Sequence, residues 1–143
     1  MAYCVVQDII DRLSSTGLLV LVDDDNDATL DASESDYVQD AIDDISTEID
    51  AALSTSFEDP SSLGGNVWIK VRAVDLACER ICERKGATAP SSISAAAQRS
   101  RDMLDQVRMR ELRVPNATYP GDGFEIERRK FGLPRAFNPG RVK

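Results

Sequence analysis

Histidine is absent from this sequence of 143 residues. A chain without histidine lacks the usual general base near neutral pH, the commonest zinc ligand and every nucleophile arrangement that uses an imidazole. Cysteine is scarce as well, because the chain has only three, an odd number that cannot all pair within one molecule. We therefore expect no enzyme and three reduced thiols, namely Cys4, Cys78 and Cys82, rather than a redox pair.

Long hydrophobic runs are also lacking. The longest apolar run covers residues 18–22, whereas a membrane-spanning helix needs about 20 apolar residues. The N-terminus has neither the basic start nor the apolar stretch of a secretory signal. The sequence therefore predicts a protein that is neither embedded in a membrane nor secreted, with enough residues for one domain and its core.

Basic residues are almost missing from the first half of the chain. Residues 1–66 carry sixteen Asp or Glu and one Arg, a net charge of −15, whereas residues 67–143 carry nine acids and sixteen bases, a net charge of +7. Two explanations stay open: the halves neutralise each other within one molecule, or the acidic half of one copy faces the basic half of the next. For the second explanation, we expect residues 23–59 of one copy to lie near bases such as Arg72, Arg99 or Arg101.

Apolar residues at helical spacing predict an all-α fold, a small bundle of about four helices. The first helix contains Val6 and is expected to stop at Gly17. The second helix is the clearest, with Ser33 as its N-cap, an apolar stripe that continues to Leu53, and acids on the other face.

The other two predicted helices follow a loop at residues 59–65 that is rich in Pro, Ser and Gly. The third helix starts near Asn66 and ends at Gly86. Its expected buried face consists of Val67, Val71, Val74, Cys78 and Ile81. The fourth helix begins at Ser91 or Ser92 and continues to about Leu112.

The composition changes at residue 114. Residues 114–143 contain four prolines, four glycines, and six bases against three acids, which is incompatible with a regular helix. We therefore divide the chain into a helical core, 1–113, and an extended basic arm, 114–143. The arm is expected to become ordered on a partner, the alternative being an arm folded back over its own bundle. Its predicted partner-binding residues are Phe124, Arg128, Arg129, Lys130, Phe131 and Phe137.

The sharpest local motif is the acidic stretch at residues 23–34. It can be set on a twelve-residue calcium loop, although Ala28 stands where a glycine normally supplies the turn. The predicted ligands would be the side chains of Asp23, Asp25, Asp27, Asp31 and Glu34 and the carbonyl oxygen of Thr29. The alternative is a solvated acidic turn that caps the following helix. Calcium is the one cofactor that the sequence suggests.

The order of these segments resembles a known family. The start of the chain, residues 2–13, resembles the opening of small phage head–tail connector (adaptor) proteins, in which a tyrosine and a short helix lead to an aspartate-rich turn. Residues 41–53, with the late Glu-Ile-Asp, and residues 69–84 resemble the next two helices of that group. Residues 104–115 resemble its closing helix and exit strand.

Two features depart from the pattern of the connector family. The chain lacks the Gly-Lys turn that the family has near Arg110 and Glu111, and the segment 116–143 is longer than the usual ending. The departures lie where the chain leaves its last helix and in the segment that is expected to contact partners. The resemblance itself extends over residues 2–115.

The resemblance implies a non-enzymatic virion protein that is made in the host cytoplasm and located at the head–tail junction. Such connectors form a ring, commonly of twelve copies, between the portal protein and a downstream tail protein. The ring extends the channel through which double-stranded DNA passes without sequence-specific binding. A different function, a calcium-responsive helical protein-binding module, depends on the acidic stretch alone. A metal-dependent nuclease is the least supported, because the clustered acids lie in one loop and on one exposed helix face.

Overall fold

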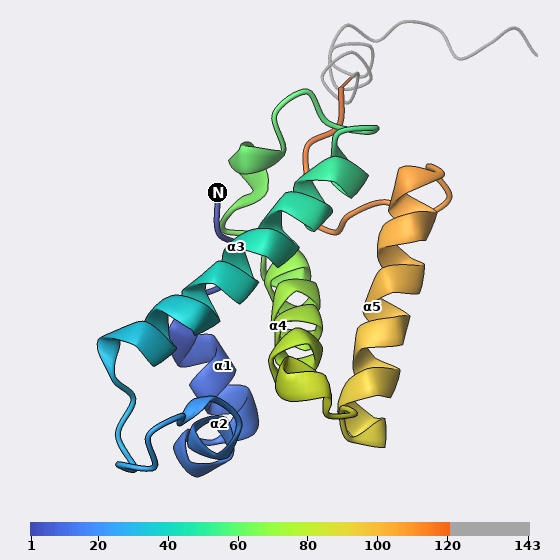
Figure 1. Ribbon diagram of the computed structural model, residues 1–143. Coiled ribbons are helices and arrows are strands. Elements are labelled where there is room, and N and C mark those ends of the chain that lie inside the picture. The colour runs from blue at the N-terminus through green and yellow to red at the C-terminus, as the bar shows by residue number, and fades with distance from the viewer. Residues whose placement is uncertain (121–143) are drawn as a thin grey trace, which may run out of the picture.

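The computed structural model describes residues 1–120, apart from the side chain of Lys85, and confirms the predicted all-α fold (Figure 1). No strand occurs within these residues. None of the helices in this part of the chain combines the length and apolar character needed to cross a bilayer. The helices are α1 (Val6–Leu13), α2 (Ser15–Val22), α3 (Ala32–Leu53), α4 (Val67–Cys82) and α5 (Ser91–Arg108), with short 3-10 turns η1 (Pro60–Leu63) and η2 (Arg84–Gly86).

Helix α4 occupies the centre of the bundle. It packs against α3, α5 and α1, while α1 and α2 form a pair near the beginning of α3 (Figure 1). Ile69, Leu76 and Ile81 of α4 are fully buried, as are Ile42 and Ile49 of α3. One continuous core therefore joins the helices.

The first helix breaks earlier than predicted. Ser14, not Gly17, ends α1, because Ser14 has a positive φ of 67° and its hydroxyl accepts a hydrogen bond from the Gly17 N–H at 3.1 Å. This is an N-cap, and it starts a second helix that contains Gly17. The apolar run at residues 18–22 thus forms most of α2, with Leu18 and Val22 buried.

The predicted buried face of α4 is correct in one half only. Cys78 and Ile81 are buried, but Val67 and Val71 are 71% and 44% exposed. The sequence pattern is ambiguous, because α4 also carries apolar residues on a second face, which includes Ile69, and residues of both faces contribute to the core. The valines lie on the opposite side, toward α1.

Helix α5 ends at Arg108 rather than near Leu112. Arg110 adopts a positive φ of 61°, and the Glu111 N–H donates to the Gln106 carbonyl oxygen at 2.8 Å. A residue in the left-handed region just after a helix terminates it in this way. The turn that ends the helix therefore lies at Arg110.

The packed core extends beyond the boundary predicted at residue 114. Val114 is only 2% exposed, and the Tyr119 ring lies 4.6 Å from the Phe57 ring. The Asn66 side chain donates a hydrogen bond to the Pro115 carbonyl oxygen at 2.7 Å. Residues 114–120 are therefore part of the folded core, whereas the rest of the predicted arm, 121–143, lies outside the described residues.

The three cysteines are expected to be unreactive in the folded protein. All are buried, and burial raises the pKa of Cys4 to about 11 and that of Cys78 to about 12. Because the thiolate is the reactive form, a disulfide reagent at pH 8 should label all three thiols only after denaturation. Rapid labelling of any of them in the native protein would contradict the burial.

Candidate functional site

The acidic loop between α2 and α3, residues 23–31, brings three carboxylates together. Oxygen atoms of Asp23, Asp25 and Asp27 lie within 4.8 Å of one another. Backbone N–H groups hold two of them in place: Asn26 and Ala28 donate to Asp23 at 2.6 and 3.1 Å, and Asp27 donates to Asp25 at 3.2 Å. The cluster therefore depends on the local turn of the backbone.

Ala28 adopts a positive φ of 61°, a conformation that favours glycine. The backbone thus turns at the position where a calcium loop normally has its glycine. The next predicted ligand, Thr29, donates both its N–H and its hydroxyl to Asp27, each at 2.7 Å. These hydrogen bonds hold Asp27 toward the inside of the loop.

Asp31 and Glu34 form the N-terminal cap of α3. Asp31 accepts a hydrogen bond from the Glu34 N–H at 2.8 Å, and Glu34 accepts from the Asp31 and Asp24 N–H groups at 3.2 and 2.8 Å. Asp31, not the predicted Ser33, is therefore the N-cap, and the Ser33 hydroxyl donates to it. Of the predicted side-chain ligands, the structure groups three in the loop and places two in this capping box.

The electrostatic environment distinguishes the two parts of the acidic stretch. The hydrogen bond from the Asp27 N–H lowers the pKa of Asp25, but desolvation and the neighbouring carboxylates outweigh it and raise this pKa above its ordinary value. The hydrogen bonds from Glu34 and Ser33 instead hold the pKa of Asp31 below its usual range. Mutual repulsion therefore acts within the cluster, whereas the cap stabilises its charge.

Arg84 joins the acidic loop to the end of α4. It forms an ion pair with Asp24 at 2.6 Å, donates to the Val22 carbonyl oxygen at 2.9 Å, and lies 4.2 Å above the Tyr37 ring. A basic side chain from the second half of the sequence thus neutralises part of the negative charge of the first half.

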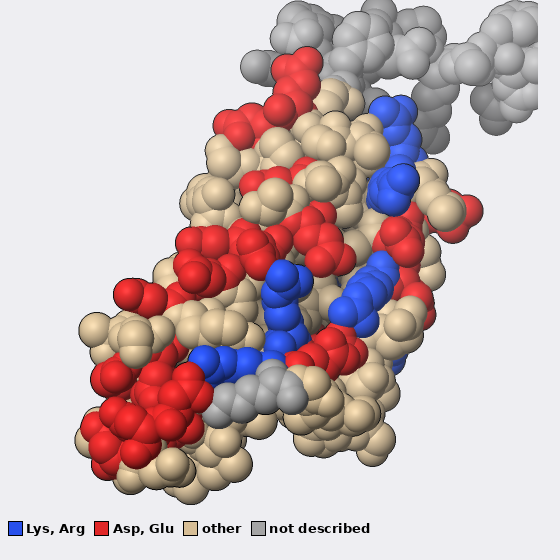
Figure 2. Space-filling view, viewed as in Figure 1, with Lys and Arg blue, Asp and Glu red and all other residues tan. Residues whose placement is uncertain are grey.

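Further ion pairs join the acidic and basic halves of the sequence. They are Arg80–Asp44 at 2.5 Å, Lys70–Asp8 at 2.7 Å and Arg12–Asp75 at 3.3 Å. Figure 2 shows acidic side chains along α3 and over the loop before it, with basic side chains beside them. Neutralisation within one molecule therefore accounts for part of the charge segregation.

An acidic ridge remains on the outer face of α3. It consists of the exposed residues Asp36, Asp40, Asp43, Asp44 and Glu48. Among the described side chains, Asp44 of this ridge is paired with Arg80, whereas Asp36, Asp40 and Glu48 form no ion pair. The ridge is thus a strongly negative surface that is available to a charged partner.

The three bases predicted at a subunit interface have different environments. Arg101 forms an ion pair with Glu79, a residue only 5% exposed, and is used within the chain. Arg72 lies 4.7 Å above the Trp68 ring, and its buried Nε has no hydrogen-bond partner. Arg99 is exposed. The structure therefore leaves Arg72 and Arg99 as the predicted bases without an acidic partner in the described part of the chain.

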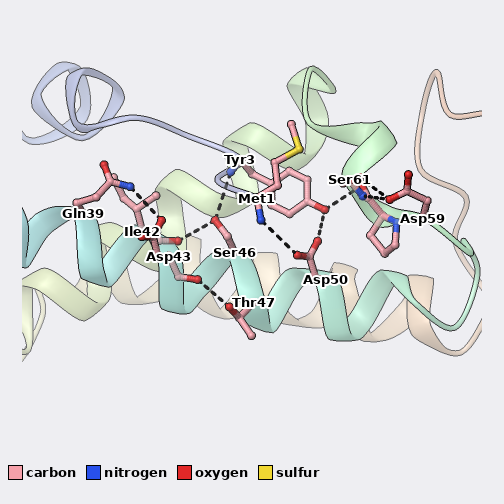
Figure 3. Close-up of polar contacts among 11 residues, drawn as sticks. Met1, Tyr3, Gln39, Ile42, Asp43, Ser46, Thr47, Asp50, Asp59 and Ser61 are labelled. Carbon is pink, nitrogen blue, oxygen red and sulfur yellow. Dashed lines mark hydrogen bonds and ion pairs between the residues drawn. The ribbon is translucent and has the colours of Figure 1, made fainter.

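A buried tyrosine anchors the N-terminus. The Tyr3 hydroxyl donates to Asp50 and lies 3.0 Å from the Pro60 carbonyl oxygen, while the Tyr3 N–H donates to Ser46 at 3.3 Å (Figure 3). Burial and the Asp50 carboxylate raise the pKa of Tyr3. In the sequence Tyr3 stood out only through the family resemblance, because no local pattern indicates that it closes the contact between α3 and η1.

The predicted partner-binding residues cannot be placed in this arrangement. Phe124, Arg128, Arg129, Lys130, Phe131 and Phe137 all lie outside the described residues. Their role stays a prediction.

Comparison with known proteins gives one family match. A family model described as "Bacteriophage Mu, Gp36" matches residues 3–122, which is most of the chain. No curated protein and no solved structure gives a significant match.

The capping box predicts different effects for two neighbouring substitutions. Asp31→Ala should lower the melting temperature by about 2–4 °C at pH 7, because it removes the N-cap, whereas Ser33→Ala should have little effect. Because the folded-state pKa of Asp31 is depressed, its contribution is present above the unfolded-state pKa and is lost as the pH falls through the folded-state value. Thermal melts at pH 7 and pH 2 test this, and a larger effect of Ser33→Ala would contradict the assignment.

The loop geometry predicts weak calcium binding at most. Three grouped carboxylates offer fewer oxygens than calcium prefers, so we expect a dissociation constant of about 1 mM or weaker. Calorimetric titration should show that Asp25→Asn abolishes the binding, while Asp36→Asn on α3 does not. Micromolar binding that is lost in Glu34→Ala would instead show that the loop rearranges to use all the predicted ligands.

Proposed function

The chain belongs to the bacteriophage Mu Gp36 family, and on that premise we propose that it is a structural protein of the virion. The proposed role is that of a head–tail connector, or adaptor, which forms a ring between the portal and the tail and extends the DNA channel. The family match over residues 3–122 carries this proposal, because it makes the chain a phage protein. The proposed protein acts without catalysis at the head–tail junction, after synthesis in the host cytoplasm.

The proposed partners are the portal protein, a downstream tail protein and further copies of this chain, commonly twelve in a ring. The acidic ridge of α3 supports protein partners rather than DNA, because phosphates carry the same sign of charge. Double-stranded DNA would accordingly pass through the ring without sequence-specific contacts.

The remaining unpaired charges support association between unlike faces. The acidic ridge lies on α3, whereas Arg72 and Arg99 belong to α4 and α5. A contact between two different faces is heterologous, and it closes into a ring when the rotation allows. Each exposed ion pair contributes little, but the same pairs repeat at every interface of a ring.

A second candidate function is the calcium-responsive helical protein-binding module. The observation that favours it is the grouping of Asp23, Asp25 and Asp27. Calcium binding by the full set of predicted ligands would compete with the role of Asp31 and Glu34 in the cap of α3. The connector is favoured because it requires no change in this loop.

The connector proposal predicts that residues 121–143 are needed for attachment to the portal but not for the fold. Deletion of these residues should change the melting temperature by less than about 5 °C, because all described core contacts remain. The truncated protein should no longer cosediment with purified portal, whereas the full chain should, as measured by sedimentation and electron microscopy.

The point of truncation is decisive in this experiment. Deletion from residue 116 would also remove Tyr119, which packs on Phe57, so its effect would combine fold and attachment. A second variant replaces Phe124, Phe131 and Phe137 by Ser in the full chain, so that attachment is tested without shortening the chain. A protein truncated after residue 120 that still cosediments with the portal would contradict the role of the arm.

A further inference from the structure

Arg72 of α4 is a half-buried cation that forms no ion pair with the described side chains. Its guanidinium lies 4.7 Å from the centre of the Trp68 ring, and its Nη2 donates to the Met103 sulfur at 3.0 Å. A thioether sulfur is a weak acceptor, and the buried Nε of Arg72 has no hydrogen-bond partner in the described part of the chain. The neighbouring side chains therefore hold Arg72 in position without neutralising its charge.

Two further bases of the α-helices share this lack of an acidic partner. Ion pairs with Asp or Glu are formed by four bases of the α-helices, namely Arg12, Lys70, Arg80 and Arg101. Arg99 and Arg108 of α5 are exposed and, like Arg72, form no ion pair among the described side chains. These three arginines are the positive charges of the α-helices that remain for a partner.

Arg72 and Arg99 belong to one surface. Arg99 and Met103 are four positions apart and share one side of α5, and Arg72 reaches this side through its contact with Met103. Arg108 is nine positions after Arg99 and therefore lies on the opposite side of the helix, where it lines the hollow between α3 and α5. We call Trp68, Arg72, Arg99 and Met103 the cationic patch, which the α4–α5 pair separates from α3.

The acidic ridge of α3 has the opposite charge and lies on the other side of the molecule. Its acids are exposed, whereas Ile42 and Ile49 on the opposite side of α3 are fully buried in the core. Figure 2 shows the acidic side chains along α3 on one face of the molecule. Because the core and the α4–α5 pair lie between the two surfaces, the ridge and the cationic patch of one molecule cannot neutralise each other.

We propose that the cationic patch of one copy binds the acidic ridge of a second copy. Opposite charges favour this pairing of surfaces and disfavour ridge against ridge or patch against patch. The patch also has the composition of an interface centre, because Trp, Met and Arg are enriched there. Stacking on Trp68 orients the Arg72 guanidinium before binding, which reduces the conformational freedom that is lost in the complex.

The contact between ridge and patch is directional. Each bound pair retains one unused ridge and one unused cationic patch, so further copies add in the same orientation, and the series closes into a ring when the rotation allows. The inference rests on the self-association in the proposed function and names the surfaces that produce it. A ring held together by other residues would overturn the inference alone, whereas association through these surfaces without attachment to the portal would overturn the connector function alone.

Charge reversal tests each surface in the full chain without portal, by sedimentation velocity at low salt. The unsubstituted chain should associate, and Arg99→Glu in the cationic patch and Asp40→Arg in the ridge should each raise the dissociation constant about tenfold, because an attraction becomes a repulsion. The matched control Arg108→Glu reverses another exposed arginine of α5, on the opposite side, and should associate like the unsubstituted chain. An unsubstituted chain that stays monomeric, or patch and ridge variants that associate as tightly as the control, would overturn the proposal.

A mixture of the two charge-reversed variants tests whether the contact joins unlike surfaces. Arg99→Glu retains an intact ridge, and Asp40→Arg retains an intact cationic patch. The mixture should therefore form complexes that contain both proteins, at a concentration where the unsubstituted chain associates and each variant alone is monomeric. A mixture that stays monomeric at this concentration would overturn the proposal.

Arg72→Lys tests the contribution of the stacked arginine. Lysine keeps the charge but presents no planar group to the Trp68 ring or to a partner carboxylate. The dissociation constant should therefore rise about tenfold, while the melting temperature, measured in parallel, shows that the fold is retained. A folded Arg72→Lys protein that associates as tightly as the unsubstituted chain would overturn the assignment of Arg72 to the contact.

Discussion

The burial of α4 on three sides is the constraint on which the rest of the structure depends. Carboxylates on such a helix need partners, because a buried carboxylate without a partner costs several kcal/mol. Glu79 accordingly pairs with Arg101 of α5, and Asp75 forms an ion pair with Arg12 of α1 and accepts a hydrogen bond from Ser100 of α5. The polar contacts of α4 thus fix the positions of its neighbours, while its apolar residues provide most of the burial.

The same arrangement explains how a chain with such separated charge can fold. Bases of α4 and of the turn after it meet acids from the first half at Asp8, Asp24 and Asp44. Exposed pairs of this kind contribute at most about 1 kcal/mol each, so they select the arrangement of the helices more than they stabilise it. Their placement leaves the surplus of negative charge on the outer face of α3, away from the core.

Spacing of apolar residues was sufficient to predict the all-α fold and the positions of α3, α4 and α5. It was insufficient where a hydroxyl or carboxylate decides a helix end. Ser14 and Asp31 act as N-caps because each finds a free N–H three residues later. Ser33 satisfies the same sequence rule without occupying that position, and Gly17, predicted to stop the first helix, lies inside α2. The buried face of α4 was ambiguous for another reason. Its sequence is apolar on two faces, and only the packing of the neighbouring helices decides which residues of each face become core.

The acidic loop shows how one set of residues can serve either of two purposes. Calcium ligation by Glu34 would require its carboxylate to leave the N–H groups of Asp24 and Asp31. The metal and the first turn of α3 therefore compete for the same carboxylate. Any calcium-bound form that uses Glu34 must lose hydrogen bonds of the cap. Asp24 also forms an ion pair with Arg84, which follows the end of α4. Such a change would therefore also affect the contact between the loop and the central helix. A loop with these attachments is suited to hold α2, α3 and α4 in a fixed arrangement, which a subunit of a rigid ring requires.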